Sequence, residues 1–145
     1  MTTYREVLRP SIWMYFAAAL IIPTIILTMA PFNLLLGVLV ALGVYVVIVL
    51  AMVLSSPKIE LTATELRVGQ AHIERRFIGP VSAYSGSHAT NARGPGLDAR
   101  AWLFLRGWIN PVVRIDITDP DDPTPYWLFS TRNPEVLVAA LRERS

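Results

Sequence analysis

The order of apolar and polar positions divides the chain into two unlike parts. From residue 10 to residue 57 the sequence contains no Lys, Arg, Asp, Glu or His. Within this run, residues 12–30 and 34–54 are almost wholly apolar, and as helices each is long enough to cross the roughly 30 Å hydrocarbon core of a bilayer. A Pro-Phe-Asn segment at 31–33 separates them, because proline interrupts a helix and asparagine favours a turn. The pattern therefore predicts a transmembrane hairpin of two helices.

The flanking charges predict how this hairpin, residues 12–54, is oriented. Arg5 and Arg9 precede the first span, Lys58 follows the second, and the connecting turn carries no charge. Because cytoplasmic flanks are enriched in Lys and Arg, we expect a multi-pass plasma-membrane protein with both termini in the cytoplasm. A cleaved signal peptide is the alternative, but Pro31 follows the small-residue site directly and a second span comes next, which disfavours cleavage.

The two predicted spans offer packing surfaces to each other and to the lipid bilayer. Neither contains an acidic, basic or amide side chain, so we expect no ion or proton path through this chain alone. Pro23 should kink the first helix, because it has no N–H to donate to the carbonyl of Ala19. Gly37 and Ala41 form a small-xxx-small pair suited to close helix packing, either within the hairpin, which we favour, or between copies.

The remainder of the chain, residues 55–145, alternates between polar and apolar residues with the period of half-buried strands. Turn-forming residues separate the candidate strands, and the segment from Ser85 to Gly96 is so rich in Gly, Ser, Thr and Asn that we expect a loop there. The predicted strands are residues 58–61, 66–68, 72–78, 81–84, 101–106, 112–118 and 126–130.

The chain is predicted to end in an amphipathic helix over residues 134–144. Asn133 is a good N-cap, Pro134 is tolerated at the first helical position, and Glu135 favours the first turn. With the cytoplasmic head (1–11), the domain order is head, membrane hairpin and a small mostly-β domain with a C-terminal helix. That order of elements resembles the bacterial pleckstrin-homology-like domains, which implies a barrel or bent antiparallel sheet with the helix at its open end.

Composition removes several classes of function. There is no cysteine, so disulfides, thiol catalysis and cysteine metal sites are excluded. The formal net charge is only +2, which gives no electrostatic reason to expect a nucleic-acid partner. The sequence contains neither a P-loop nor a dinucleotide-binding fingerprint, and no cofactor is predicted.

Four sequence segments are similar to those of an actinobacterial membrane family known as domain of unknown function 3093. The resemblance covers nearly the whole chain and implies a membrane location without implying an activity. The segments are Tyr4-Arg5-Glu6; residues 55–60; residues 93–101; and residues 119–132, from Asp119-Pro120 through Pro125-Tyr126-Trp127 to Ser130-Thr131-Arg132.

The Arg-Gly-Pro-Gly segment that begins at Arg93 is the leading candidate for a binding site. Arg93, Asp98, Arg100 and Arg106 could form an anion- or partner-binding surface, because arginine forks match phosphate and carboxylate groups. The alternative, which we favour, is a tight turn with an Arg–Asp pair, since Gly and Pro are the usual turn residues.

The other polar candidates are better explained as structure. His72 and His88 have no neighbouring carboxylate at a ligand-like spacing, so both are expected to be surface residues. The acidic turn at 119–122 contains prolines and lacks the Gly and Glu of a calcium-binding loop.

These observations favour a non-enzymatic, membrane-anchored module that binds a protein partner, as an accessory or assembly subunit of a larger membrane complex. The first alternative is a sensor of lipid headgroups or small anions at the inner membrane surface. The second is an enzyme of a type that the motifs do not identify.

Overall fold

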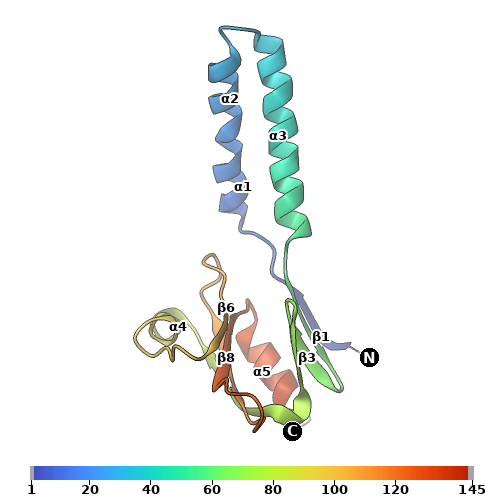
Figure 1. Cartoon of the computed structure of the whole chain (residues 1–145), viewed down its shortest axis with the longest axis vertical. Helices are drawn as coiled ribbons and strands as arrows, with labels where there is room; N and C mark the ends of the chain where they lie inside the picture. The colour runs from blue at the N-terminus through green and yellow to red at the C-terminus, as the bar shows by residue number, and fades with distance from the viewer. Residues whose placement is uncertain (1, 144–145) are drawn as a thin grey trace. The chain divides into compact units, whose positions relative to one another are not determined.

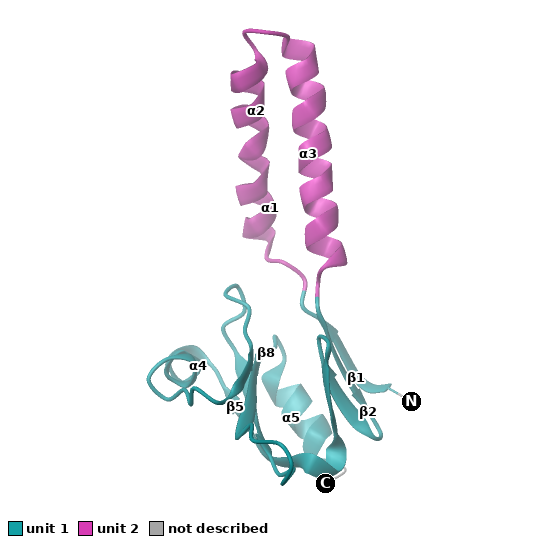
Figure 2. Cartoon of the chain, in the orientation of Figure 1, with its two compact units in different colours: residues 1–8, 57–145 teal, residues 9–56 magenta. Residues whose placement is uncertain are grey.

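A computed structural model describes residues 2–143 and divides the chain into two compact units (Figure 2). One unit comprises the chain up to Leu8 together with everything from Pro57 onward, and the other is Arg9–Ser56. The boundary differs from the predicted one, because the first residues of the chain join the β-rich unit instead of forming a separate head.

The apolar unit is a hairpin of helices. The first stretch comprises α1 (Ile12–Ala19) and α2 (Ile21–Met29), and the second is α3 (Leu34–Leu54) (Figure 1). Both stretches are long and apolar enough to cross a membrane, and most of their large side chains are exposed. Asn33 begins α3, accepting a 3.1 Å hydrogen bond from the backbone N–H of Leu36 in the manner of an N-cap.

The interruption between α1 and α2 falls at Leu20, three residues before Pro23. Proline has no N–H to donate to the carbonyl four residues back, which weakens the helix at this point. The hydroxyl of Thr24 donates a 2.9 Å hydrogen bond to a different carbonyl oxygen, that of Leu20, in its own helix. Polar atoms within an apolar helix are thereby satisfied locally.

Small residues set the approach of α3 to α2. Gly37 and Ala41 are the buried residues of α3. A Cβ added at Gly37 would lie 3.0 Å from the Cβ of Met29 and 3.7 Å from the Cα of Ile26. The small-residue pair therefore packs within the hairpin, with glycine at the point where no side chain has room.

The first sheet of the β-rich unit has the strand order β1-β2-β3-β4. Its antiparallel strands are β1 (Thr2–Val7), β2 (Lys58–Thr62), β3 (Glu65–Val68) and β4 (Ala71–Glu74). Strand β1 comes before the helical hairpin in the sequence and β2 comes after it, yet Val7 pairs with Lys58. The N–H of Leu8 donates a 2.9 Å hydrogen bond to the carbonyl of Pro57, so the two connections to the hairpin leave this sheet side by side.

The second sheet has the order β5-β7-β8-β6. Its strands are β5 (Ile78–Tyr84), β7 (Val112–Ile117), β8 (Tyr126–Ser130) and β6 (Trp102–Phe104), and β6 pairs with β8 in parallel. The predicted strand at 72–78 is divided, because the 3₁₀ turn η1 (Arg75–Phe77) carries the chain from one sheet to the other. The strands of the described residues thus form two four-stranded sheets and not the expected barrel or single bent sheet.

The main core is built from both sheets and from α5 (Pro134–Arg142), which lies between them (Figure 1). The stripe on α5 buries Leu137, Val138 and Leu141. Arg75 connects the first sheet to α5, because its guanidinium donates to the carbonyls of Thr62 on β2 at 3.2 Å and of Leu141 on α5 at 3.1 Å. A cation at carbonyls of the last helical turn satisfies groups that have no partner within the helix.

The outer face of the second sheet is covered by α4 (Gly86–Arg93), where the sequence led us to expect a loop. The prediction was wrong because tertiary contacts support a segment of weak helical preference. Ala89 is fully buried against Val112 and Leu128 in a second apolar cluster. Gly86 has a φ of +57°, and its N–H donates a 2.8 Å hydrogen bond to the side chain of Asn110.

Candidate functional site

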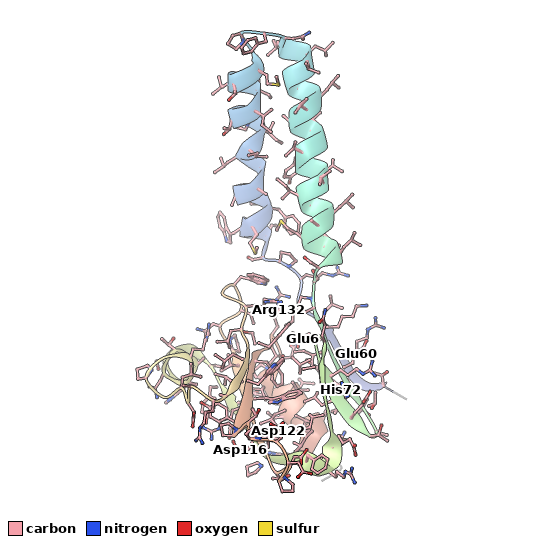
Figure 3. All side chains as sticks on the ribbon, viewed as in Figure 1. Glu6, Glu60, His72, Asp116, Asp122 and Arg132 are labelled. Carbon is pink, nitrogen blue, oxygen red and sulfur yellow. The ribbon has the colours of Figure 1, made fainter. Side chains whose placement is uncertain are left out.

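A buried carboxylate attaches strand β1 to the far end of the chain. Glu6 is 9% exposed and accepts hydrogen bonds from the hydroxyl of Tyr4 (2.8 Å), the hydroxyl of Thr131 and the backbone N–H of Arg132 (2.8 Å). We refer to these four residues as the Glu6 cluster; Figure 3 labels Glu6 and Arg132. The cluster unites two of the segments that suggested the family resemblance, Tyr4-Arg5-Glu6 and Ser130-Thr131-Arg132.

The surroundings of the Glu6 cluster raise the pKa of Tyr4. Burial of the ring and the hydrogen bond to Glu6 raise the pKa of Tyr4 to about 12. Both causes favour the neutral phenol, which can donate to a carboxylate where a phenolate could not. The cluster therefore holds β1 in the sheet through donors that match one buried acceptor group.

A small pocket lies between α4 and the face of the second sheet that α4 covers. Its volume is about 200 Å³. We call it the donor pocket, since most of its polar groups can donate hydrogen bonds; its lining comes from β5, β7, β8, α4 and the loop after α4. The lining residues are Tyr84, His88, Asn91, Ala92, Gly96, Arg114, Tyr126 and Leu128.

Arg114 is the charged group of the pocket, and two contacts fix its position. Its Nε lies 2.8 Å from Oδ1 of Asp116, and its guanidinium carbon lies 3.9 Å from the centre of the Tyr126 ring. Partial burial by itself would lower the pKa of Arg114, but the hydrogen bond and charge of Asp116, together with Tyr126 and Tyr84, outweigh it and the net shift is upward. The side chain is therefore a cation that is already oriented before any ligand is present.

The two tyrosines of the pocket contribute hydroxyl groups. Tyr126 is only 4% exposed, and its oxygen accepts a 2.7 Å hydrogen bond from the N–H of Asp98. Within residues 2–143, no acceptor is found for the hydroxyl hydrogen of Tyr126, and the hydroxyl of Tyr84 makes no hydrogen bond. Tyr84 is half-buried and both tyrosines line the pocket, so each hydroxyl can donate a hydrogen bond to a molecule that enters it.

The residues chosen from the sequence as a binding surface are largely occupied with local contacts. Arg93 donates to the carbonyl oxygen of Asn110. Arg100 and Asp98 form an ion pair of 3.0 Å, which also lowers the pKa of Asp98 through the side-chain and backbone hydrogen bonds from Arg100. Arg106 lies over the ring of Phe104, 4.4 Å from its centroid. No contact in the described part of the chain joins Arg93, Arg100 and Arg106 into one site.

The remaining polar candidates also separate. His72 lies on β4 of the first sheet, whereas His88 lies on α4, which packs against the second sheet. Of the two, His88 lines the donor pocket. Asp119 and Asp122 accept hydrogen bonds from backbone N–H groups of their own turn, at 3.0 and 2.8 Å. Among the described residues there is no cluster of three His, Cys, Asp or Glu side chains that could hold a metal ion.

Sequence reasoning missed the principal residues of the pocket, namely Tyr84, Arg114 and Tyr126. Polar and apolar residues alternate along β7, which puts Arg114 and Asp116 on the face opposite the buried Val113 and Ile115, and the pocket lies on that face. The missing information was that α4 covers this face, since a segment predicted as a loop gives no wall to a pocket.

A family model described as "Protein of unknown function (DUF3093)" matches residues 3–141. No curated protein and no solved structure matches the chain. The family resemblance expected from the four sequence segments is thereby confirmed, and the matched range includes the Glu6 cluster and the donor pocket.

Proposed function

This chain belongs to the family described as protein of unknown function (DUF3093), which names no activity, and from its geometry we propose that it is a non-enzymatic, membrane-anchored binding module. In this proposal the helical hairpin spans the plasma membrane, and the β-rich unit is held at the cytoplasmic surface. Its role is to bind a protein partner as an accessory or assembly subunit of a membrane complex.

The observation that carries the proposal is the pairing of β1 with β2 on either side of the hairpin. Strands that hydrogen-bond to each other, as Val7 and Lys58 do, must lie on the same side of a membrane. A chain that leaves at Leu8 and returns at Pro57 can therefore cross the bilayer only an even number of times. Two apolar helical stretches supply such a pair of crossings.

The same pairing argues against removal of the N-terminal segment as a signal peptide. Cleavage before Pro31 would take away β1, the fully buried Leu8 and the carboxylate of Glu6. Thr131 and the N–H of Arg132 would then lose their acceptor. The positive flanks Arg5 and Arg9 support the cytoplasmic side for the retained strand.

Exposed aromatic and basic groups on the loop after β6 support a protein partner. Trp108 is 37% exposed, and the guanidinium of Arg106 lies 5.9 Å from its ring centroid. Leu103 of β6 is exposed as well. Tryptophan and arginine are the residues most enriched among the energetically dominant positions of protein interfaces.

Labelling with a membrane-impermeant thiol reagent tests the topology, and the absence of natural cysteine makes single-cysteine variants unambiguous. In intact cells we expect Asn33→Cys to react and Gln70→Cys to react only after permeabilisation. Reaction of Gln70→Cys in intact cells, or of neither variant in any condition, would contradict the proposed orientation.

Native purification from the source membrane, followed by mass spectrometry, tests the partner. We expect a stoichiometric protein companion that is lost in a Trp108→Ala, Arg106→Ala double variant. A Val136→Ala variant, which alters another exposed apolar residue, should keep the companion. Homogeneous purification of the chain without any companion would overturn this part of the proposal.

A further inference from the structure

We propose that the donor pocket is a binding site for a small oxyanion, that is, a phosphate or carboxylate group, with Arg114 as its charge partner. None of the residues invoked for a protein partner lines this pocket, and the inference does not depend on that partner. The pocket also differs from the anion surface suggested by the sequence, because Arg93, Asp98, Arg100 and Arg106 are not among its lining residues.

The Arg114 guanidinium is held in place while part of its hydrogen-bonding capacity stays unused. Its Nε is engaged by Asp116, and one flat face lies against the ring of Tyr126. Its two terminal nitrogens donate no hydrogen bond to any residue between 2 and 143. An arginine fixed on two sides, with its fork unoccupied, matches the bidentate geometry of a phosphate or carboxylate.

The groups that surround Arg114 in the pocket include four polar side chains that form hydrogen bonds. The hydroxyls of Tyr84 and Tyr126, the amide of Asn91 and the imidazole of His88 can all donate hydrogen bonds, and all line the pocket. No carboxylate belongs to the lining, because Asp116 contacts Arg114 from outside it. These hydroxyl, amide and imidazole groups can also accept hydrogen bonds, so it is the positive charge of Arg114, a side chain that only donates, that favours an oxyanion over a cation.

The volume of the donor pocket suits a small ligand. A water molecule takes about 30 Å³ of liquid volume, and drug-sized ligands occupy pockets of roughly 300–1,000 Å³. At about 200 Å³ the donor pocket admits a phosphate, a small carboxylic acid or one headgroup phosphate, but not a nucleotide.

The test is calorimetric titration of the full-length chain in detergent with inorganic phosphate and, separately, with succinate. A third arm uses vesicles of phosphatidylcholine with and without phosphatidic acid, which distinguishes a lipid headgroup from a free anion. We expect saturable binding in at least one arm, in the millimolar range or tighter. No binding in all three arms would overturn the inference.

Variants locate the site. We expect Arg114→Gln to weaken binding by about tenfold to a hundredfold, since a charge-assisted hydrogen-bond pair is lost, and Tyr84→Phe by about threefold to tenfold. Arg67→Gln is the matched control, because Arg67 pairs with Glu65 at 2.7 Å across the same two-residue spacing but lies in the first sheet.

The control variant should bind within about twofold of the unaltered chain, since exposed pairs elsewhere contribute little. Equal losses in Arg67→Gln and Arg114→Gln would show nonspecific attraction and would overturn the site. Arg114 is a packed residue, so the Arg114→Gln variant can fail to fold. In that case Tyr84→Phe tests the site by itself, and an unchanged affinity in Tyr84→Phe would overturn the inference.

Discussion

The carboxylate of Glu6 accepts a hydrogen bond from the hydroxyl of Thr131, although the two residues lie 125 positions apart in the chain. This contact joins the strand before the helical hairpin to the segment that begins α5. The β-rich unit is therefore a single body built from both sides of the hairpin, and several measurable consequences follow from that arrangement.

Replacing the buried acceptor should be costly. Glu6→Gln puts an amide donor among groups that themselves donate, Tyr4, Thr131 and the N–H of Arg132. We expect the free energy of unfolding to fall by about 2–4 kcal/mol, as for other buried charged hydrogen-bond acceptors. Thermal and denaturant unfolding followed by tryptophan fluorescence measures the change.

Glu60→Gln is the control for that substitution. Glu60 pairs with Arg5 at 3.3 Å on the same two strands, but both side chains are substantially exposed. The expected loss is about 0–1 kcal/mol, because water and salt screen such pairs. Similar losses for Glu6→Gln and Glu60→Gln would show that the Glu6 cluster is no more important than a surface ion pair.

The hairpin should be replaceable by a tight turn. Leu8 and Pro57 are hydrogen-bonded neighbours at the adjacent ends of β1 and β2. An Asn-Gly turn in place of residues 9–56, combined with Pro57→Val to supply the N–H that closes the turn, therefore joins the two strands in a favoured geometry. We expect a soluble chain with cooperative thermal unfolding by circular dichroism. The fragment 57–145 should be less stable, since burying Leu8 alone contributes about 1.5–3 kcal/mol.

That comparison decides whether β1 is integral to the fold. Equal stability of the fragment 57–145 and of the turn-linked chain would show that β1 is not needed for the stability of the β-rich unit. The result also bears on any assay that uses the C-terminal part by itself, because such a fragment lacks the strand that covers the edge of β2.

Tyr4 should make stability depend on alkaline pH. Its pKa is raised from the ordinary 10.0 to about 12 in the folded chain, first by burial and then by the hydrogen bond to Glu6. The folded state thus holds the proton after the unfolded state has released it. The contribution of Tyr4 is complete below pH 10 and is lost as the pH rises toward 12.

Tyr4→Phe isolates this effect, because phenylalanine has no proton to lose. The stability of the unaltered chain should decrease relative to that of Tyr4→Phe between pH 10 and pH 12. Parallel pH profiles for the two proteins would show that Tyr4 ionises alike in the folded and unfolded states.

Helix packing in the hairpin should tolerate a side chain at one glycine and not at another. A Cβ at Gly37 would meet that of Met29 at 3.0 Å, whereas nothing lies within 4 Å of one at Gly43. Gly37→Leu should weaken the packing by about 1–3 kcal/mol through overpacking. Hydrogen–deuterium exchange of the α2 amides should accelerate in Gly37→Leu and stay unchanged in Gly43→Leu.

The sequence alone determined the features that depend on local pattern. The uncharged run predicted two apolar helices, since hydrophobicity and length are properties of neighbouring residues. Alternation predicted most strands, and the Asn-Pro-Glu start predicted α5. These elements can be predicted from neighbouring residues because a helix or strand with one buried face carries apolar side chains at a fixed spacing.

Tertiary structure decided whatever depends on partners distant in the chain. Nothing in Tyr4-Arg5-Glu6 indicates a strand, because the strand that pairs with it, β2, follows the hairpin in the sequence. The role of Glu6 as a hydrogen-bond acceptor likewise depends on a distant residue, Thr131. Likewise α4 is helical because of the sheet beneath Ala89, and Arg114 became a candidate site only when α4 enclosed it. Pairing energies between remote segments leave no period in the sequence, so only the folded chain shows them.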